Sequence, residues 1–169
     1  MTRNHSSILA FEVGNDVQDY GFQIAASHSD SPTFKVKERA EMTVKGHYTK
    51  LNTEGYGGML CAPWFDRPLS LAGRAVVRTK DGIQERLVKI DRDLLLIPSL
   101  AIHMNRKVNE GQKFNLQEDM LPLLSARELE LDTVRKLIAE ELQIRPEHIL
   151  GMDLFLYNRM NLDLGLEEE

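Results

Sequence analysis

The stretch SLAGRAVVRTKDGIQERLVKI, residues 70–90, decides the fold class of this 169-residue chain. Two runs rich in strand-forming residues, Ser70–Thr79 and Ile83–Ile90, flank the dipeptide Asp81-Gly82. An Asp-Gly pair between two such runs is a strong signal for a tight β-hairpin. The stretch therefore predicts two antiparallel strands in the middle of the sequence.

Further strands are predicted on both sides of this hairpin. Apolar residues alternate with polar ones, or gather in short runs, at residues 33–37, 42–48, 94–98 and 151–157. Five or six strands between residues 33 and 100, with turn signals between them, predict a small β-barrel or sandwich. The expected fold class is α+β, mostly β.

One helix is predicted after these strands. Residues 131–142 carry apolar side chains at helical spacing, namely Leu131, Val134, Leu137, Ile138 and Leu142. Asp132 is the expected N-cap, and Pro146 is expected to open a second, short helical turn.

Two strands are also predicted near the N-terminus, at residues 7–13 and 20–26, and are expected to pair through a longer loop. The chain begins with strand-like sequence soon after Met1 and ends on the acidic run Glu167–Glu169. The N-terminal residues show no secretory signal pattern. We therefore expect the sequence to be a piece of a longer protein.

Composition and charge exclude several classes of function. Hydrophobic residues make up 42% and charged residues 28% of the chain, as in ordinary globular domains. A formal net charge of -5 without a long basic cluster argues against nucleic acid as a partner. The most apolar run, residues 94–97, is far shorter than the roughly 20 residues of a membrane span, so no membrane partner is expected. The single cysteine, Cys61, fits a reducing, cytoplasmic compartment.

The stretch SHSDSP, residues 27–32, carries the most suggestive chemistry. Residues i and i+2 of an extended segment point to the same side, so His28 and Asp30 are expected to lie together. A carboxylate that holds one ring nitrogen of a metal-binding His fixes its orientation. A surface turn with an exposed His explains the same spacing, and two residues do not make a metal site. From the residues alone, both interpretations stay open.

Other candidate residues carry weaker signals. His103 follows the apolar run LLLIPSLAI, where a lone His is usually a structural or surface residue. Trp64-Phe65 beside Asp66-Arg67 predicts aromatic packing next to an ion pair. Glu140-Glu141 are expected on a solvated helix face.

Five stretches, in this order and at similar spacing, resemble the aspartyl aminopeptidase and vacuolar aminopeptidase I family of dinuclear zinc exopeptidases. They are TRNHSSILAF (2–11), GFQIAASHSDSPTFKVK (21–37), GYGGMLCAPWFDRPLSLAGR (55–74), RLVKIDRDLLLIPSLAIHMNR (86–106) and NLQEDMLPLL (115–124). The similarity covers nearly the whole chain, and these motifs are long and distinctive.

The resemblance implies a domain organisation. In this family a β-rich domain that forms dimers is inserted into the zinc-peptidase catalytic domain, and the dimers assemble into dodecamers. Residues 1–32 would then be strands of the catalytic domain. Residues 33–158 would be the inserted dimerisation or lid domain, β-barrel-like with one or two helices. Residues 159–169 would return toward the rest of the catalytic domain.

The resemblance also assigns roles to three residues. The motif His28-Ser29-Asp30-Ser31-Pro32 matches the family's H-T-D-S-P motif, with Ser29 in place of Thr. His28 matches a zinc ligand, and Asp30 matches the active-site acid that orients it. His103 matches a His that crosses the dimer interface and helps to hold substrate in the neighbouring active site.

The family binds two zinc ions per subunit, and its remaining ligands follow the inserted domain, beyond Glu169. Residues Glu167–Glu169 come too early to match the family's Glu-Glu pair. A catalytic zinc needs about three protein ligands. We therefore expect this chain alone to be inactive and to hold no zinc tightly.

The resemblance implies that the whole protein is a cytoplasmic zinc aminopeptidase that removes N-terminal, acidic residues from peptides. This chain would supply dimerisation with a second copy and substrate gating. One alternative is a free-standing interaction and assembly domain without a catalytic role. Another is a structural lid related to other metallopeptidases and glucanases.

Overall fold

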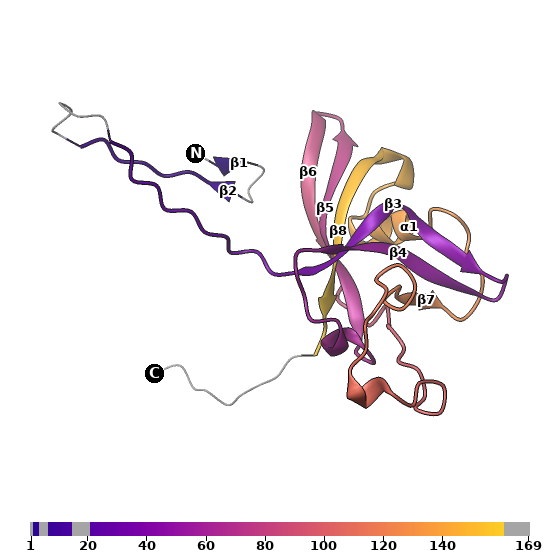
Figure 1. Cartoon of the computed structure of the whole chain (residues 1–169). Helices are drawn as coiled ribbons and strands as arrows, with labels where there is room; N and C mark the ends of the chain where they lie inside the picture. The colour runs from indigo at the N-terminus through magenta and orange to yellow at the C-terminus, as the bar shows by residue number, and fades with distance from the viewer. Residues whose placement is uncertain (1, 4–6, 15–20, 161–169) are drawn as a thin grey trace, which may run out of the picture. The chain divides into compact units, whose positions relative to one another are not determined.

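The computed structural model describes residues 2–3, 7–14 and 21–160. The chain divides into two compact units, residues 1–30 and residues 31–169. The second unit contains a six-stranded antiparallel sheet and one α-helix (Figure 1). This architecture confirms the predicted α+β, mostly β fold class.

The strand order in this sheet is β6-β5-β8-β3-β4-β7. The hairpin predicted around Asp81-Gly82 is confirmed. Its two strands, β5 and β6, pair along their length, from Ala72 opposite Lys89 to Thr79 opposite Gly82. The strands in chain order are β3 (Thr33–Val44), β4 (Tyr48–Tyr56), β5 (Leu69–Thr79), β6 (Gly82–Lys89), β7 (Leu123–Ser125) and β8 (Ile149–Asn158).

Residues 95–97, where a short strand is predicted, join two distant parts of the sheet. Leu95 forms an antiparallel bridge with Leu69 at the start of β5, and Leu96 forms one with Leu123 of β7. These bridges connect β7 back to β5, so the sheet curls into an incomplete barrel. Strand β6 lies outside this ring because it pairs with β5 alone among the described strands.

The core fills the interior of this curled sheet. Phe34 of β3 is fully buried and meets Trp64 edge to face, with ring centroids 5.1 Å apart. Trp64 belongs to the short 3₁₀ turn Ala62–Trp64. Other fully buried side chains of the core are Leu51, Leu69, Leu71, Ile97, Met120, Ile138 and Leu154.

The predicted helix is present as α1 (Thr133–Glu141) and buries Val134, Ile138 and Ala139. Leu131, expected on the apolar stripe, lies before the helix and is 79% exposed. The short turn predicted at Pro146 is confirmed as the 3₁₀ turn Pro146–His148.

The helix start differs from the prediction. Asp132 occupies the N-cap position but has a left-handed backbone, with φ 62°, and makes no side-chain capping bond. The carboxylate of Glu41, from β3, instead accepts a hydrogen bond from the Val134 N–H at 2.7 Å. The cap therefore comes from a strand more than 90 residues away in the sequence.

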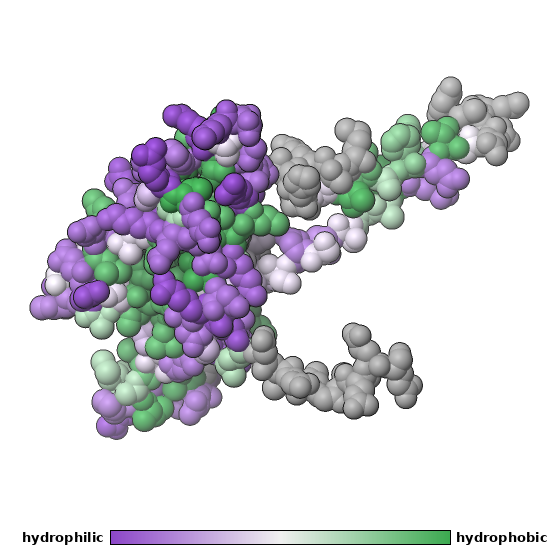
Figure 2. Space-filling view, turned by 180° about the vertical axis from the view of Figure 1, so that it is seen from behind, coloured by the Kyte–Doolittle hydropathy of each residue, from purple (hydrophilic) through white to green (hydrophobic). Residues whose placement is uncertain are grey.

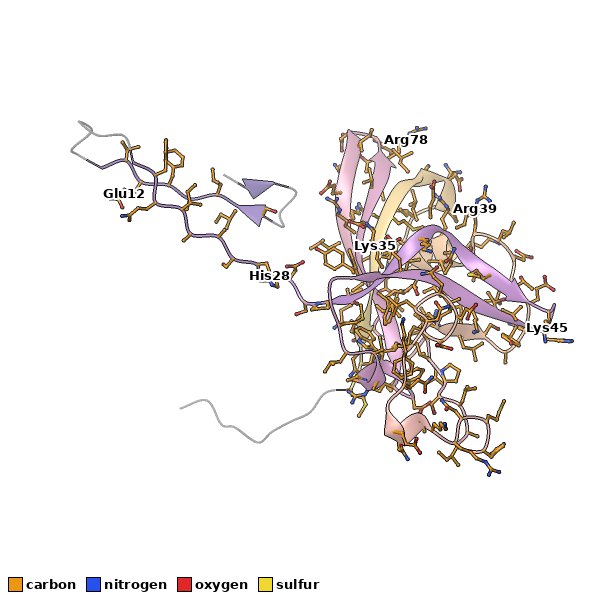
Figure 3. The ribbon with its side chains drawn as sticks, viewed as in Figure 1. Glu12, His28, Lys35, Arg39, Lys45 and Arg78 are labelled. Atoms are coloured by element: carbon orange, nitrogen blue, oxygen red, sulfur yellow. The ribbon has the colours of Figure 1, made fainter. Side chains whose placement is uncertain are left out.

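The prediction of one strand over residues 42–48 is wrong, because the chain reverses direction within it. Lys45 and Gly46 have left-handed φ values of 52° and 69°. The His47 N–H donates to the Val44 carbonyl at 3.1 Å, which closes the turn between β3 and β4. Left-handed conformations are typical of tight hairpin turns, but lysine gives little signal for one. Figure 3 shows Lys45 at the tip of this hairpin.

The predicted pairing of residues 7–13 with residues 20–26 is also wrong for the part of it that is described. Strand β2 (Ser7–Ile8) pairs instead with β1 (Thr2–Arg3), and residues 9–14 and 21–32 have no regular secondary structure. The apolar side chains of this unit are uncovered (Figure 2), and Phe22 is 89% exposed. Strands without a buried face lack the packing that stabilises them. Residue 20 lies outside the described residues.

The end of the predicted return segment, residues 161–169 with Glu167–Glu169, also lies outside the described residues. None of the described helices is both long and apolar enough to cross a membrane.

A close approach between β5 and β8 yields a first prediction. A Cβ on Gly73 would lie 2.1 Å from the backbone oxygen of Asp153, so one strand would have to move. We predict that Gly73→Ala lowers the free energy of unfolding by about 2–4 kcal/mol. Urea denaturation followed by Trp64 fluorescence measures the change. The control is Gly151→Ala in β8, where a Cβ meets nothing within 4 Å. Equal losses in both variants would contradict the prediction.

Candidate functional site

His28 and Asp30 lie together, as their spacing predicts. The His28 Nδ1 atom is 3.0 Å from Asp30 Oδ1 and 3.2 Å from the Asp30 carbonyl oxygen. The side chains are 81% and 54% exposed, so the pair is open to solvent. With Nδ1 facing the carboxylate, Nε2 is the nitrogen that a ligand would meet. Figure 3 shows His28 on the segment that precedes β3.

The structure leaves both interpretations of this pair open, because His28 is exposed like a surface residue but does not lie in a turn. Residues 21–32 contain neither a turn nor a bend. The side-chain contact therefore arises from an extended segment, in which alternate residues share a side. The geometry is that of an imidazole oriented by a carboxylate.

His103 lies in a turn of the second unit. The Met104 N–H donates to the Ala101 carbonyl at 2.9 Å, and the His103 side chain is exposed. Its apolar neighbours Leu100, Ile102 and Met104 are exposed by more than half of their surface. An exposed His within a small apolar patch is suited to contact with another molecule.

The loop that carries His103 is fixed at its base. The Asp66 N–H donates to the Ile97 carbonyl at 2.9 Å, and the Asp66 carboxylate accepts from the Ser99 N–H at 3.0 Å. On the return side, the Leu51 N–H donates to the Pro122 carbonyl at 2.7 Å. The exposed turn thus projects from two anchored ends.

The described residues can be tested as a zinc site. An imidazole whose second nitrogen faces a carboxylate is typical donor chemistry for zinc, and His28 with Asp30 has it. No group of three or more His, Cys, Asp or Glu side chains in the described part of the chain could hold a metal ion. Because catalytic zinc needs about three protein ligands, these residues supply one ligand and not a complete site.

Comparison with known proteins identifies the family. The profile described as "Aminopeptidase I zinc metalloprotease (M18)" matches residues 1–169. The chain belongs to the M18 aminopeptidase family. It is 43% identical over 176 residues to the "Probable M18 family aminopeptidase 2" of Clostridium novyi (strain NT). It is 47% identical over 161 residues to the protein of the same name from Clostridium acetobutylicum.

A solved relative shares the fold. A chain in the cryo-EM structure of the Ape4 and Nbr1 complex superposes with a TM-score of 0.70 and 34% identity, over 79% of this chain and 29% of that one. The two clostridial M18 proteins align with 100% and 92% of this chain, which spans 41% and 37% of their own length. The chain thus spans less than half of the curated M18 relatives that it matches.

The anchor at Asp66 is a feature that sequence reasoning missed. An ion pair of Asp66 with Arg67 is predicted, but among the described residues Asp66 bonds to the Ser99 backbone instead. Asp66 has a left-handed backbone, with φ 56°. Aspartate tolerates this conformation and often accepts backbone N–H groups in turns. That preference is the signal that could have identified the anchor.

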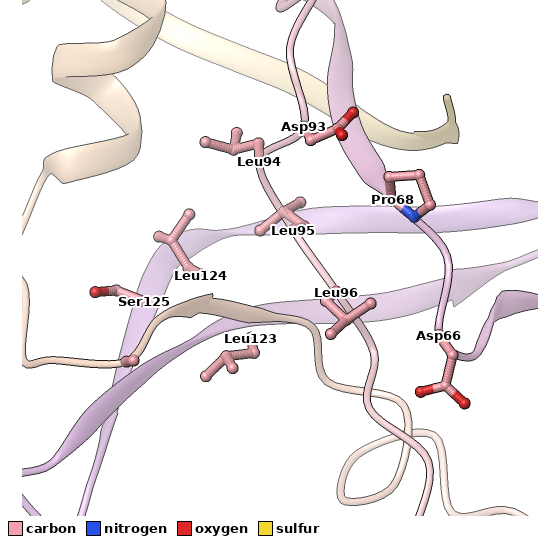
Figure 4. A pocket seen from close by; sticks show the side chains of 10 residues that line it. Asp66, Pro68, Asp93, Leu94, Leu95, Leu96, Leu123, Leu124 and Ser125 are labelled. Carbon is pink, nitrogen blue, oxygen red and sulfur yellow. The ribbon is translucent and has the colours of Figure 1, made fainter. Parts of the chain in front are cut away.

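A groove of about 560 Å³ lies between residues 94–96 and β7 (Figure 4). Leucine side chains from both segments line it, and Asp66 and Asp93 lie at its side. Both carboxylates already have partners, since Asp66 accepts from the Ser99 N–H and Asp93 accepts from Arg159 Nε at 2.8 Å. The groove therefore offers no paired acid and base for catalysis.

A second pocket, of about 290 Å³, lies beneath the His103 loop. Phe65 and Phe114 line it, with ring centroids 5.2 Å apart, together with the buried Leu121. Its walls also include Asn105 and Gln112 of the loop, which bond to each other at 2.6 Å. A pocket with such a lining can accept an apolar side chain. Its shape depends on the position of the loop, because loop residues form part of its wall.

The loop anchor generates a second prediction. The hydrogen bonds from Ser99 hold the pKa of Asp66 below the ordinary range of an aspartate. The ionised Asp66 carboxylate therefore stabilises the folded state at pH values above the pKa of Asp66 in the unfolded chain. This stabilisation is lost as pH falls through the lower pKa that Asp66 has in the folded state. We expect the Ser99 amide shift, followed by NMR, to titrate below about pH 4.

Asp66→Asn is the matched control for this titration. Asn tolerates the left-handed backbone and keeps an oxygen acceptor, but it carries no titrating charge. The Ser99 shift should then stay constant over the same pH range. A Ser99 titration that persists in Asp66→Asn would contradict the assignment.

Proposed function

We propose that this chain is the inserted β-rich domain of a zinc-dependent M18 aminopeptidase, preceded by strands of the catalytic domain. One observation carries the proposal: the chain enters and leaves the β-rich unit at one place. The Thr33 hydroxyl donates to the Leu156 carbonyl at 2.6 Å, and Lys35 is the ladder partner of Phe155. A domain whose ends lie side by side can be inserted into another without distorting either.

His28 and Asp30 supply part of the metal site in this proposal. They come directly before β3, and so mark the point where the catalytic domain is interrupted. His28 would bind zinc through Nε2, while Asp30 orients the ring. The other ligands and the catalytic base would come from residues beyond this chain, and the substrate would be a peptide with an acidic N-terminal residue.

His103 supplies the second part of the proposal. Its turn is exposed, carries apolar neighbours and projects from an anchored base. These properties suit a loop that reaches into the active site of a neighbouring subunit and helps to hold substrate there. The β-rich unit would thus assemble dimers, and through them dodecamers, and gate access to the site.

Zinc binding by this chain provides a third prediction. One His ligand gives only weak binding, so calorimetric titration with zinc should show no stoichiometric binding at micromolar concentrations. His28→Ala should give the same result. Stoichiometric binding that disappears in His28→Ala would contradict the proposal, because it would mean that these residues complete a site.

A hybrid enzyme provides a fourth prediction and tests the function directly. This chain, put in place of the part of the Clostridium novyi relative that it covers, should release N-terminal aspartate from peptides in the presence of zinc. We expect His28→Ala to abolish activity, and Asp30→Asn to lower it by about 10- to 100-fold, as for other carboxylates that orient a metal ligand.

The hybrid also has a matched control. His47→Ala replaces an exposed histidine in the turn between β3 and β4, and should leave activity unchanged. His103→Ala should raise the KM for peptides and retain zinc. A folded hybrid that is inactive would refute the proposed function and favour a free-standing interaction domain. Activity that survives His28→Ala would refute the proposed role of His28 as a zinc ligand.

A further inference from the structure

Strand β6 is an outer strand of the described sheet, where its described ladder partner is β5. It is eight residues long, and all of them except Val88 are exposed. Ile83 and Leu87 keep 69% and 86% of their surface uncovered. A long edge strand with exposed aliphatic side chains is a template for pairing with another strand.

Two features by which proteins often block such an edge, a proline and a bulge, are absent from β6. It contains no proline. Its pairing with β5 has no bulge between the pair Ala72 and Lys89 and the pair Thr79 and Gly82. Charged side chains are a further means of protection. In β6 they are ordered: Glu85 and Lys89 flank Leu87 on the same face, two residues to either side.

This order favours one way for β6 to pair with its own copy. Two antiparallel strands related by a two-fold axis perpendicular to the sheet place one residue opposite itself. An axis at Glu85 or at Arg86 would set like charges directly against each other, which is unfavourable. An axis at Leu87 sets an aliphatic pair at the centre and two Glu85–Lys89 pairs beside it.

We propose that β6 pairs antiparallel with β6 of a second copy of this chain, across a two-fold axis at Leu87. Glu85 of each copy then lies opposite Lys89 of the other, and the two sheets become continuous. The inference rests on the assembly role proposed above and names the surface that performs it. Charge complementarity identifies the partner, because the strand is complementary to itself in this register.

The neighbouring contacts are compatible with this pairing. Arg74 Nη1 lies 3.2 Å from Glu85 Oε1, and Lys89 Nζ lies 5.6 Å from the centroid of the Tyr157 ring. Both partners belong to strands of the same sheet, so they hold the two charged side chains along its face. The charged groups are therefore ordered before a second strand arrives.

Disulfide trapping tests the register. Residues opposite each other in antiparallel strands have Cα atoms about 4.5–5.5 Å apart, within the range that a disulfide spans. In a Cys61→Ser background, Leu87→Cys should form a covalent dimer as its main product under mild oxidation. Ile83→Cys should remain monomeric, since its two copies would lie about 27 Å apart.

The trapping result has clear alternatives. Equal linkage at positions 83 and 87 would indicate unspecific association, and linkage in Glu85→Cys instead would indicate the register with Glu85 at the axis. Either result, or no linkage at all, overturns the proposal. The hybrid enzyme tests the proposed function separately, so an active hybrid with no linkage at Leu87→Cys would overturn this surface alone.

Charge reversal gives an independent readout. Lys89→Glu should weaken the dimer by about tenfold in sedimentation experiments, because two attractive pairs become repulsive. The double variant Glu85→Lys/Lys89→Glu restores opposite charges and should recover most of the loss. Failure of the double variant to recover would overturn the proposed register.

Discussion

The contact between β3 and β8 is the constraint on which the rest of the structure depends. Thr33 and Leu156, which bond across this contact, lie 123 residues apart in the sequence, yet the two strands join the β6-β5-β8 half of the sheet to the β3-β4-β7 half. Their described ladder is a single pair, Lys35–Phe155, reinforced by the hydroxyl of Thr33. Because β3 is bulged beyond Val36, it turns away from β8 and follows β4 around the barrel.

This short seam has two consequences. It closes the core around Phe34 and Leu154, which are buried on the inner faces of the two strands. It also places the beginning and the end of the β-rich unit next to each other. The fold of the β-rich unit thus couples its core to the position of its own two ends.

The sequence predicts best where the structure is local. The β5–β6 hairpin follows from Asp81-Gly82, and α1 follows from the spacing of Val134 and Ile138. The turn at Lys45 was missed because lysine gives little signal for the left-handed backbone found there, although Gly46 beside it favours one. The cap of α1 was misassigned because Glu41 reaches it from another element. At this cap a tertiary contact outweighed local propensity.

In the candidate site, too, contacts between residues close in the sequence are predicted better than contacts between distant residues. The contact of His28 with Asp30 is local, so their spacing predicts it correctly. The anchor of Asp66 on Ser99 spans 33 residues and was assigned to the neighbouring Arg67 instead. A complete zinc site is harder still to predict from sequence, because its ligands come from elements that are distant in the sequence and pack against one another. Phe22, in the same segment as His28, is 89% exposed. The β-rich unit has its own core, whereas His28 and Asp30 lie on an exposed segment, so the fold of that unit does not rest on the residues that carry the candidate chemistry.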